Sequence, residues 1–343
     1  MLDEKIVREI EKQVKKLPNV QGYSKTLKKK IVKGEETSIM AIRIYVDKKI
    51  KPESELKPAH IIPKTIEDIP TDVVAIGTAY APPRGTLKTR KKTVDKTQKF
   101  RPVILGVSIG SYAITAGTNG MLYTDKNGDV LFGSNAHVFC EDPSEKPENV
   151  KETRIVQPGK YDGGTENDVV ANYVWHQQIH SNLSPSQCPV ADVWALIYNA
   201  LAEAFKAKTR LKPVTEEVNQ IDFAVAKPLV DYELKFPDFD FTGYKLVGHG
   251  FAGSDVTSII CKIKFIQKQG YTPLNVETAE AKVGDTLEKS GRTSCHTSAK
   301  VIDESAVVQV SYGTFTATFD DVILVEGEFL KPGDSGSSAW LKT

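Results

Sequence analysis

A serine near the end of the chain has the neighbours that a nucleophile needs. Ser335 lies in the sequence Gly333-Asp334-Ser335-Gly336. Glycines on both sides let the backbone adopt conformations that most residues avoid. Such a turn can aim the amide N–H groups of Gly333 and Ser335 at one point, where they stabilise an oxyanion. A serine hydroxyl alone is a weak nucleophile, so it also needs a base and an acid that orients the base.

Candidates for both partners precede the serine. His137 follows an apolar stretch that breaks into small residues at 133–136, which places an imidazole at the end of a strand. Asp222 interrupts the apolar run 221–226, and a charge buried in a strand is costly unless it is paired. Taken singly, these motifs also fit an ordinary strand end, an edge carboxylate and a hairpin turn. Their order along the chain, His then Asp then Ser, favours a catalytic triad.

The same motifs belong to a set of stretches that carry a family resemblance. They lie at 106–110, 114–118, 134–138, 157–164, 221–226, 290–293 and 333–336. In these stretches the chain resembles trypsin-like serine peptidases, in particular the branch of archaea, bacteria and phages related to plant narrow-leaf-type proteases. The resemblance implies a chymotrypsin-like double β-barrel with the active site between the barrels. It also implies a triad of His137, Asp222 and Ser335 and an oxyanion hole formed by Gly333 and Ser335.

The resemblance further implies where the substrate pocket lies. Its base falls six residues before the nucleophile, at Phe329, with Leu330 beside it. Because neither residue is a carboxylate, we do not expect a preference for Arg or Lys at the P1 position of the substrate. A small or medium apolar P1 side chain is expected instead.

The end of the sequence departs from the family pattern. Thr343 comes eight residues after Ser335, and residues 337–341 can supply one strand. The resemblance implies a further hairpin and usually a helix after that strand. A barrel without two of its strands would expose unpaired edges and core. We therefore expect a longer precursor cut near Thr343, with self-processing the more economical route, and a bound C-terminal fragment that completes the barrel.

The first part of the chain predicts a small α+β domain. Asp3 can cap a helix over about 4–16, and strands are expected at 38–47 and 71–76. Residues 81–101 are rich in Lys and Arg and predict a linker. A solvated loop is favoured there over a nucleic-acid site because aromatic residues are not interleaved. We divide the chain into an N-terminal domain with its linker at 1–95 and a protease domain at 96–343.

The rest of the chain predicts a mainly β fold. From 103 onward, short strands with frequent turns are typical of barrels or sandwiches, and Asn127-Gly128 predicts a hairpin. The exception is 189–208, which is rich in alanine and predicts a helix inserted between the strands of His137 and Asp222.

Two further motifs suggest a dinucleotide site and a zinc site, but each lacks a feature that such a site needs. Residues 248–253 fit a glycine-rich dinucleotide motif, but a strand rather than a helix follows, so a phosphate would lack its helix N-terminus. His176 and His180 have the spacing of a zinc-protease helix, but Gln177 stands where the catalytic glutamate is needed. Two loop histidines are favoured over a structural metal site.

Composition sets broad limits. The 343 residues allow two or three domains, and 40% hydrophobic with 26% charged residues is ordinary for a globular protein. A net charge of +1 predicts no general attraction to nucleic acid or anionic membranes. The first residues have no signal-peptide core and no run approaches transmembrane length, so we expect a cytoplasmic protein.

Together these features predict a serine endopeptidase that hydrolyses a peptide or protein substrate without a metal or other cofactor. The alternative is a non-catalytic interaction module that keeps the protease fold as a scaffold. A monomer and a homo-oligomer are both compatible with the sequence.

Overall fold

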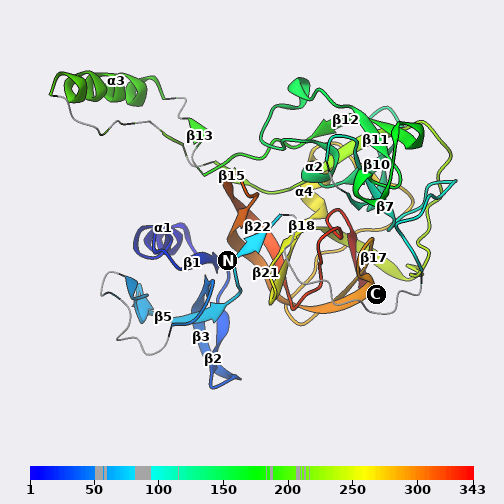
Figure 1. The fold of residues 1–343 in the computed structure, drawn as a ribbon. Coiled ribbons are helices and arrows are strands. Elements are labelled where there is room, and N and C mark those ends of the chain that lie inside the picture. Colours follow the sequence, from blue (N-terminus) through cyan, green and yellow to red (C-terminus); the bar gives the residue numbers. More distant parts are fainter. Residues whose placement is uncertain are drawn as a thin grey trace.

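The computed structural model describes residues 1–50, 57, 60–81, 94–114, 116–182, 184–185, 188–205, 209, 211, 214–215 and 217–343. Figure 1 shows a mainly β molecule, as predicted, with two large sheets and one helix, α3, that stands apart from them. Most of the basic linker expected at 81–101 lies outside the described residues.

Six strands of the larger sheet close into a ring. Its core contains Val247, Leu287, Ile323 and other apolar side chains that the alternation of a barrel strand turns inward. Around the ring the strands are β17 (Tyr244–Gly253), β18 (Thr257–Lys262), β22 (Thr316–Glu326), β21 (Cys295–Ser311), β20 (Thr286–Gly291) and β23 (Ser338–Lys342). Strand β23 pairs back with β17.

This ring corrects the expectation that the second barrel lacks two strands. Trp340, in the last strand, lies opposite Leu246 of β17 on one side and opposite Glu288 of β20 on the other, so both edges of β23 are paired. The hairpin of β20 and β21 that closes the ring precedes Ser335 in the sequence, whereas the sequence argument looked for it after the nucleophile. The bound C-terminal fragment was expected only because two strands were thought to be missing. Its existence remains an untested prediction.

The second sheet is an open half-barrel. Its strands, in spatial order, are β19 (Thr272–Pro273), β9 (Met121–Thr124), β10 (Val130–Ser134), β16 (Ala224–Pro228), β12 (Val169–His176), β11 (Arg154–Val156), β7 (Ser108–Ser111) and β8 (Gly117–Thr118). The hairpin predicted at Asn127-Gly128 joins β9 and β10, and Gly128 has the positive φ of 82° that such a turn requires. Pairing of β10 with β16 sets Ser134 beside Ala224, which brings the segments of His137 and Asp222 together.

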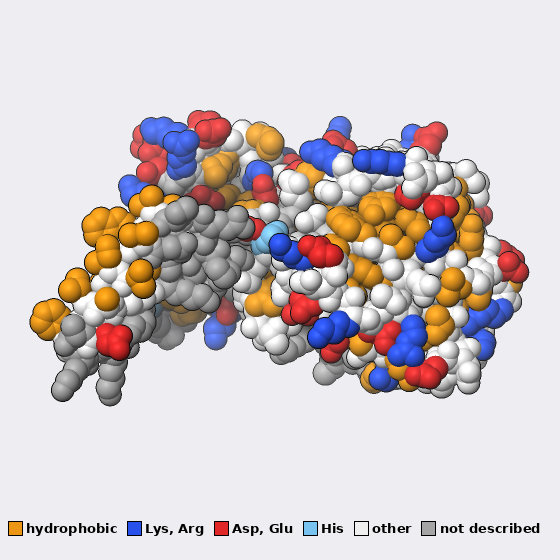
Figure 2. Space-filling model, turned by 90° about the horizontal axis from the view of Figure 1, so that it is seen from above, with side chains coloured by type: hydrophobic (Ala, Val, Ile, Leu, Met, Phe, Trp, Pro, Cys, Tyr) orange, Lys and Arg blue, Asp and Glu red, His pale blue; other side chains and the backbone are white. Residues whose placement is uncertain are grey.

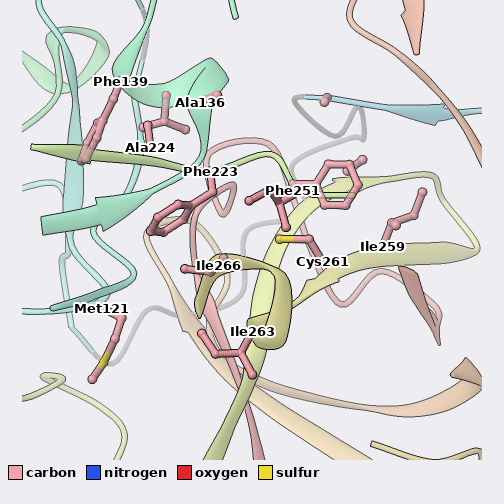
Figure 3. Close-up of a cluster of buried hydrophobic side chains, with 14 of the residues drawn as sticks. Met121, Ala136, Phe139, Phe223, Ala224, Phe251, Ile259, Cys261, Ile263 and Ile266 are labelled. Atoms are coloured by element: carbon pink, nitrogen blue, oxygen red, sulfur yellow. The ribbon is translucent and has the colours of Figure 1, made fainter. Parts of the chain in front are cut away.

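One apolar core runs between the two sheets. It includes Phe223 from the half-barrel side and Phe251 and Cys261 from the ring, with Ile263 and Ile266 of helix α4 (Ile263–Lys268). Figure 3 shows these side chains grouped around the same region. Packing between the sheets therefore fixes how the two halves of the candidate site face each other.

The N-terminal segment extends the larger sheet. Helix α1 (Glu4–Gln13) begins as predicted at Asp3, whose carboxylate accepts the N–H of Ile6 at 2.9 Å. Strand β1 pairs with β21, and Gly22 approaches so closely that a Cβ there would lie 1.9 Å from the Val307 carbonyl oxygen. The strands of this segment are β1 (Val20–Ser24), β2 (Lys28–Val32), β3 (Glu35–Val46), β4 (Thr65–Ile66), β5 (Ile69–Ala75) and β6 (Ala79–Tyr80).

Smaller elements complete the described chain. Helix α3 spans Pro189–Ala204, where the sequence predicted 189–208. Among the described residues, no helix is long and apolar enough to cross a membrane. The remaining short helices and strands are α2 (Ala136–Phe139), η3 (Pro147–Asn149), η4 (Lys160–Asp162), η5 (Glu166–Asp168), β13 (Ser184–Pro185), β14 (Val214–Thr215) and β15 (Val218–Asn219).

Replacement of Trp340 by alanine tests the closure of the ring by β23. The indole is fully buried, its ring centroid lies 5.0 Å from that of Phe241, and its N–H donates to Ser338 Oγ at 2.8 Å. Trp340→Ala should lower the free energy of unfolding by about 3–5 kcal/mol, as expected for a buried aromatic residue. The exposed Leu229 is the control, and Leu229→Ala should change it by about 0.5 kcal/mol or less. If urea denaturation showed that Trp340→Ala and Leu229→Ala lower the free energy of unfolding equally, the result would contradict a closed ring.

Candidate active site

His137 and Asp222 form a buried hydrogen-bonded pair. His137 lies in the single helical turn α2, directly after β10, and its Nδ1 is 2.5 Å from Asp222 Oδ2. The other carboxylate oxygen accepts the N–H of Ala136 at 2.6 Å, and Asn135 Nδ2 donates to the Asp222 carbonyl at 2.7 Å. With the Nδ1 proton facing a carboxylate, Nε2 is left as the acceptor that a general base requires.

Tyr312 is a member of this cluster that sequence reasoning missed. Its hydroxyl donates to Asp222 Oδ2 at 2.7 Å, the same oxygen that contacts His137. Burial, followed by the negative charge of Asp222, raises the pKa of Tyr312 well above its usual value, so the phenol remains a donor. Tyr312 comes from the turn between β21 and β22, so this contact joins the ring to the half-barrel. The local sequence predicts only a hairpin turn there.

The loop of Ser335 is held from both sheets. On one side, the Ser335 carbonyl accepts the N–H of Thr118 at 2.8 Å. On the other side, the Gly336 N–H donates to the Gly250 carbonyl at 2.9 Å, and His249 Nδ1 lies 2.8 Å from the Gly336 carbonyl oxygen. The backbone on both sides of the Ser335 side chain is therefore fixed.

The segments of Ser335 and His137 meet at Gly117, and the two side chains form no hydrogen bond with each other. A Cβ at Gly117 would lie 2.5 Å from a methyl group of Val138 and 2.9 Å from the Ser335 carbonyl oxygen, so both segments crowd the same glycine. Ser335 Oγ and His137 Nε2 are buried, and neither has a hydrogen-bond partner among the described residues. A serine hydroxyl and an imidazole nitrogen are thus both left unpaired.

The turn before the serine leaves two backbone donors available. Gly333 has a φ of 91°, and a Cβ there would lie 2.4 Å from Arg292 Nη1, so only glycine fits. Its carbonyl oxygen accepts a hydrogen bond from Thr118 Oγ1 at 2.9 Å. Within the described part of the chain, the N–H groups of Gly333 and Ser335 donate to no acceptor. These are the two groups that the sequence assigned to the oxyanion hole.

Asp334 anchors this turn in the interior of the protein. Its carboxylate is fully buried, lies 2.9 Å from the equally buried Lys289 Nζ, and accepts the backbone N–H groups of Thr293, Ser294 and Lys331 at 2.8–3.0 Å. Burial alone would raise the pKa of Asp334, but the charge of Lys289 and these hydrogen bonds outweigh it and lower the pKa. The sequence showed Asp334 but not the partner that holds it.

A second ion pair links the turn between β20 and β21 to the half-barrel. Arg292 Nε donates to Asp162 Oδ2 at 2.6 Å, and Ser108 Oγ donates to the same oxygen at 2.5 Å. The backbone N–H of Arg292 also donates to Thr118 Oγ1 at 3.0 Å. Four of the stretches on which the family resemblance rests, 106–110, 114–118, 157–164 and 290–293, are thereby joined in space.

The residues expected in the substrate pocket lie mostly inside the ring. Phe329 and Leu330 are each 2% exposed, and Leu330 packs so tightly against Gly250 that a Cβ there would lie 2.6 Å from its methyl group. Phe329 also borders a hollow of about 380 Å³, which is otherwise lined by residues 296–299 and 326–328. The apolar P1 preference stays a prediction.

The two histidines with zinc-protease spacing have protein partners. His176 Nδ1 lies 2.6 Å from the Tyr173 hydroxyl, and His180 Nδ1 lies 2.6 Å from Glu217. Across the described residues, no group of three or more His, Cys, Asp or Glu side chains is arranged to hold a metal ion.

Comparisons with known proteins were made for the whole chain. A scan against protein-family models and a search of curated proteins found no match. Among solved structures, the chain is similar to the crystal structure of Nocardiopsis protease (NAPase), at 14% identity and a TM-score of 0.34, over 70% of this chain and 79% of that chain. We therefore base the function on the geometry of the site.

The buried His249 should make the protein sensitive to acid. Its Nε2 lies 2.5 Å from the Tyr123 hydroxyl, and burial lowers its pKa to about 4, from about 6.5 in an unfolded chain. Between these two values the unfolded imidazole binds a proton and the folded one does not. The folded state should therefore lose about 3 kcal/mol as the pH falls from about 6.5 to about 4, with no such change above 6.5.

Urea denaturation of the wild type and His249→Gln across this pH range measures the effect. The glutamine keeps a polar side chain but cannot titrate, so its stability curve should be flatter between pH 6.5 and 4. Equal slopes for the two proteins would show that another group causes the acid sensitivity.

Proposed function

We propose that this chain is a serine endopeptidase in which Ser335 is the nucleophile, His137 the general base and Asp222 the residue that orients it. The ring and the half-barrel would then be the two halves of a chymotrypsin-like fold, of the trypsin-like branch that the sequence resembles. The observation that carries the proposal is the buried His137–Asp222 pair, whose outer nitrogen is unpaired. The Ser335 hydroxyl is unpaired as well, and its segment meets the segment of His137 at Gly117.

In this proposal the cycle begins when Ser335 Oγ attacks the carbonyl carbon of the scissile peptide bond. His137 Nε2 takes the hydroxyl proton and then gives it to the leaving amine, while Asp222 stabilises the imidazolium. The N–H groups of Gly333 and Ser335 bind the oxyanion of the tetrahedral intermediate, and each such donor contributes on the order of 3 kcal/mol. A water molecule activated by His137 then releases the acyl group in the same way.

The near-complete burial of the site supports one alternative. Ser335 is 1% exposed and the His137 side chain is 7% exposed, so little of either side chain faces solvent. A non-catalytic interaction module with a protease fold would keep such a closed site. We do not include self-processing near Thr343 in the proposal, because that expectation was based on a barrel with two strands missing, and the ring is closed.

Labelling with a fluorophosphonate probe tests the proposal, because the probe reacts covalently with an activated serine. Wild type should be labelled, and Ser335→Ala and His137→Ala should not. Ser337→Ala is a matched control, since the Ser337 hydroxyl is equally buried and unpaired but two residues away. It should be labelled like wild type. A folded wild type that resists the probe would contradict the endopeptidase and favour the interaction module.

Removal of the Tyr312 hydroxyl should slow the reaction without weakening substrate binding. A hydrogen bond to a charged group contributes about 1.5–3 kcal/mol, which corresponds to a loss in kcat of about tenfold or more. Tyr312 contacts Asp222 and not the proposed substrate, so KM of Tyr312→Phe should stay near the wild-type value. Steady-state kinetics on a peptide substrate provide both constants.

Tyr173→Phe is the control for this experiment. It removes a hydroxyl that also lies beside a histidine nitrogen, that of His176, which is not one of the three proposed catalytic residues. Its kcat should match wild type. If the two variants lose the same activity, Tyr312 has no special role in positioning Asp222.

A further inference from the structure

Helix α3 exposes an unusual number of large apolar side chains. In Figure 1 it projects away from both sheets, and Figure 2 shows hydrophobic side chains gathered at this end of the molecule. Their exposed fractions range from 42% for Tyr198 to 82% for Phe205. The set consists of Val190, Val193, Trp194, Leu196, Ile197, Tyr198, Leu201 and, directly after the helix, Phe205.

These side chains cover somewhat more than half of the helix circumference. With 3.6 residues per turn, they occupy a continuous arc of about 200° that runs from Leu196 through Ile197 to Tyr198. The remaining side, about 160° wide, is the one tied to the protein. There Ala195 and Ala202 are buried, and the Asn199 side chain exchanges two hydrogen bonds of 2.7 and 2.8 Å with the backbone of Leu211.

The width of the arc favours an apolar medium over a groove in another protein. A helix that packs on one protein surface needs an apolar stripe only a little wider than about 100°, and a helix that is apolar on more sides is normally surrounded. The 16 residues of α3 span about 24 Å, which is shorter than the roughly 30 Å hydrocarbon core of a bilayer. Trp194 and Tyr198 have the amphipathic rings that are enriched at the boundary between lipid and water.

Charge in the adjoining sequence indicates the kind of lipid. The seven residues after Phe205 include Lys206, Lys208, Arg210 and Lys212 and no acidic residue. The helix itself carries Asp192 and Glu203, so four basic and two acidic residues leave a net charge of +2 over residues 189–212. Each basic residue near a membrane contributes about 1 kcal/mol of attraction to anionic headgroups. The net charge of +1, from which the sequence predicted no membrane partner, averages over the whole chain and hides this local excess.

We propose that α3 is an interfacial helix that attaches the protein to anionic membrane surfaces. The helix lies in the plane of the surface, its apolar arc among the headgroups and outer acyl chains, and the opposite side with Asn199 faces the rest of the protein. Apolar insertion and electrostatic attraction then act together, and stable peripheral attachment usually requires two such signals. This role is independent of the proposed peptidase activity.

Sedimentation with lipid vesicles tests the attachment on the full chain. Wild type should bind vesicles of phosphatidylcholine and phosphatidylserine, should bind phosphatidylcholine alone more weakly, and should be released by salt. Leu196→Asp and Ile197→Asp place a charge on the exposed arc and should each weaken binding about tenfold or more. Leu229→Asp, at an apolar residue 56% exposed on the half-barrel, should bind like wild type.

Two results would overturn the proposal. One is a wild type that stays in the supernatant with anionic vesicles, or a Leu229→Asp variant that loses as much binding as Leu196→Asp. The other is a wild type that sediments as an oligomer without lipid and becomes monomeric in Leu196→Asp and Ile197→Asp. In that case α3 packs against other copies of the chain. Probe labelling of Ser335 in the same samples reports on the proposed peptidase separately.

Discussion

The buried ion pair between Lys289 and Asp334 is the contact on which the candidate site depends most. Both side chains are fully buried, and the loss of one partner from such a pair leaves an uncompensated charge in the interior, at a cost of about 3–5 kcal/mol. Asp334 lies between Gly333 and Ser335, so its position sets the direction of the peptide groups on either side. Lys289 in turn is fixed because β20 pairs with β21 on one side and β23 on the other. The closed ring therefore positions the N–H groups of Gly333 and Ser335, which are the proposed oxyanion donors.

The second requirement is that the ring and the half-barrel keep a fixed relation. His137 and Asp222 belong to the half-barrel side, whereas Ser335 belongs to a loop of the ring. Beyond the shared apolar core, polar contacts cross between them, including Tyr312 with Asp222 and Arg292 with Asp162. Each of these contacts ends on a residue of the site or of its supporting loops. A small shift of one sheet against the other would therefore change the distance between base and nucleophile.

Local motifs explain how much of this could be predicted from the sequence. His137, Asp222 and Gly333 follow from short patterns, and the structure places the first two in contact and gives Gly333 its positive φ. Helix α1 and the hairpin at Asn127-Gly128 follow from capping and turn rules that also act over a few residues. Sequence reasoning missed Tyr312 and Lys289 because their roles depend on which distant strands become neighbours.

The predicted order of the strands in the ring was wrong for the same reason. The expectation of missing strands took the strand order from a family resemblance, but β20 and β21 occupy the closing positions although they come before Ser335. Pairing between segments far apart in the chain is set by the packing of the whole sheet, and alternating apolar patterns do not specify it. A mainly β fold was therefore predictable, while its closure was not.

The buried polar atoms left without partners are concentrated around the proposed site. In the described residues they are Asn119 Oδ1, Asn135 Oδ1, His137 Nε2, Ser335 Oγ and Ser337 Oγ. All five lie in the three segments that meet at the proposed triad, around Thr118, His137 and Ser335. A buried group without a hydrogen bond costs about 1–3 kcal/mol, so elsewhere such atoms are paired. A chain shaped by stability alone would carry apolar side chains at these positions. In the proposed peptidase, the donors and acceptors of a bound substrate would lie next to these atoms.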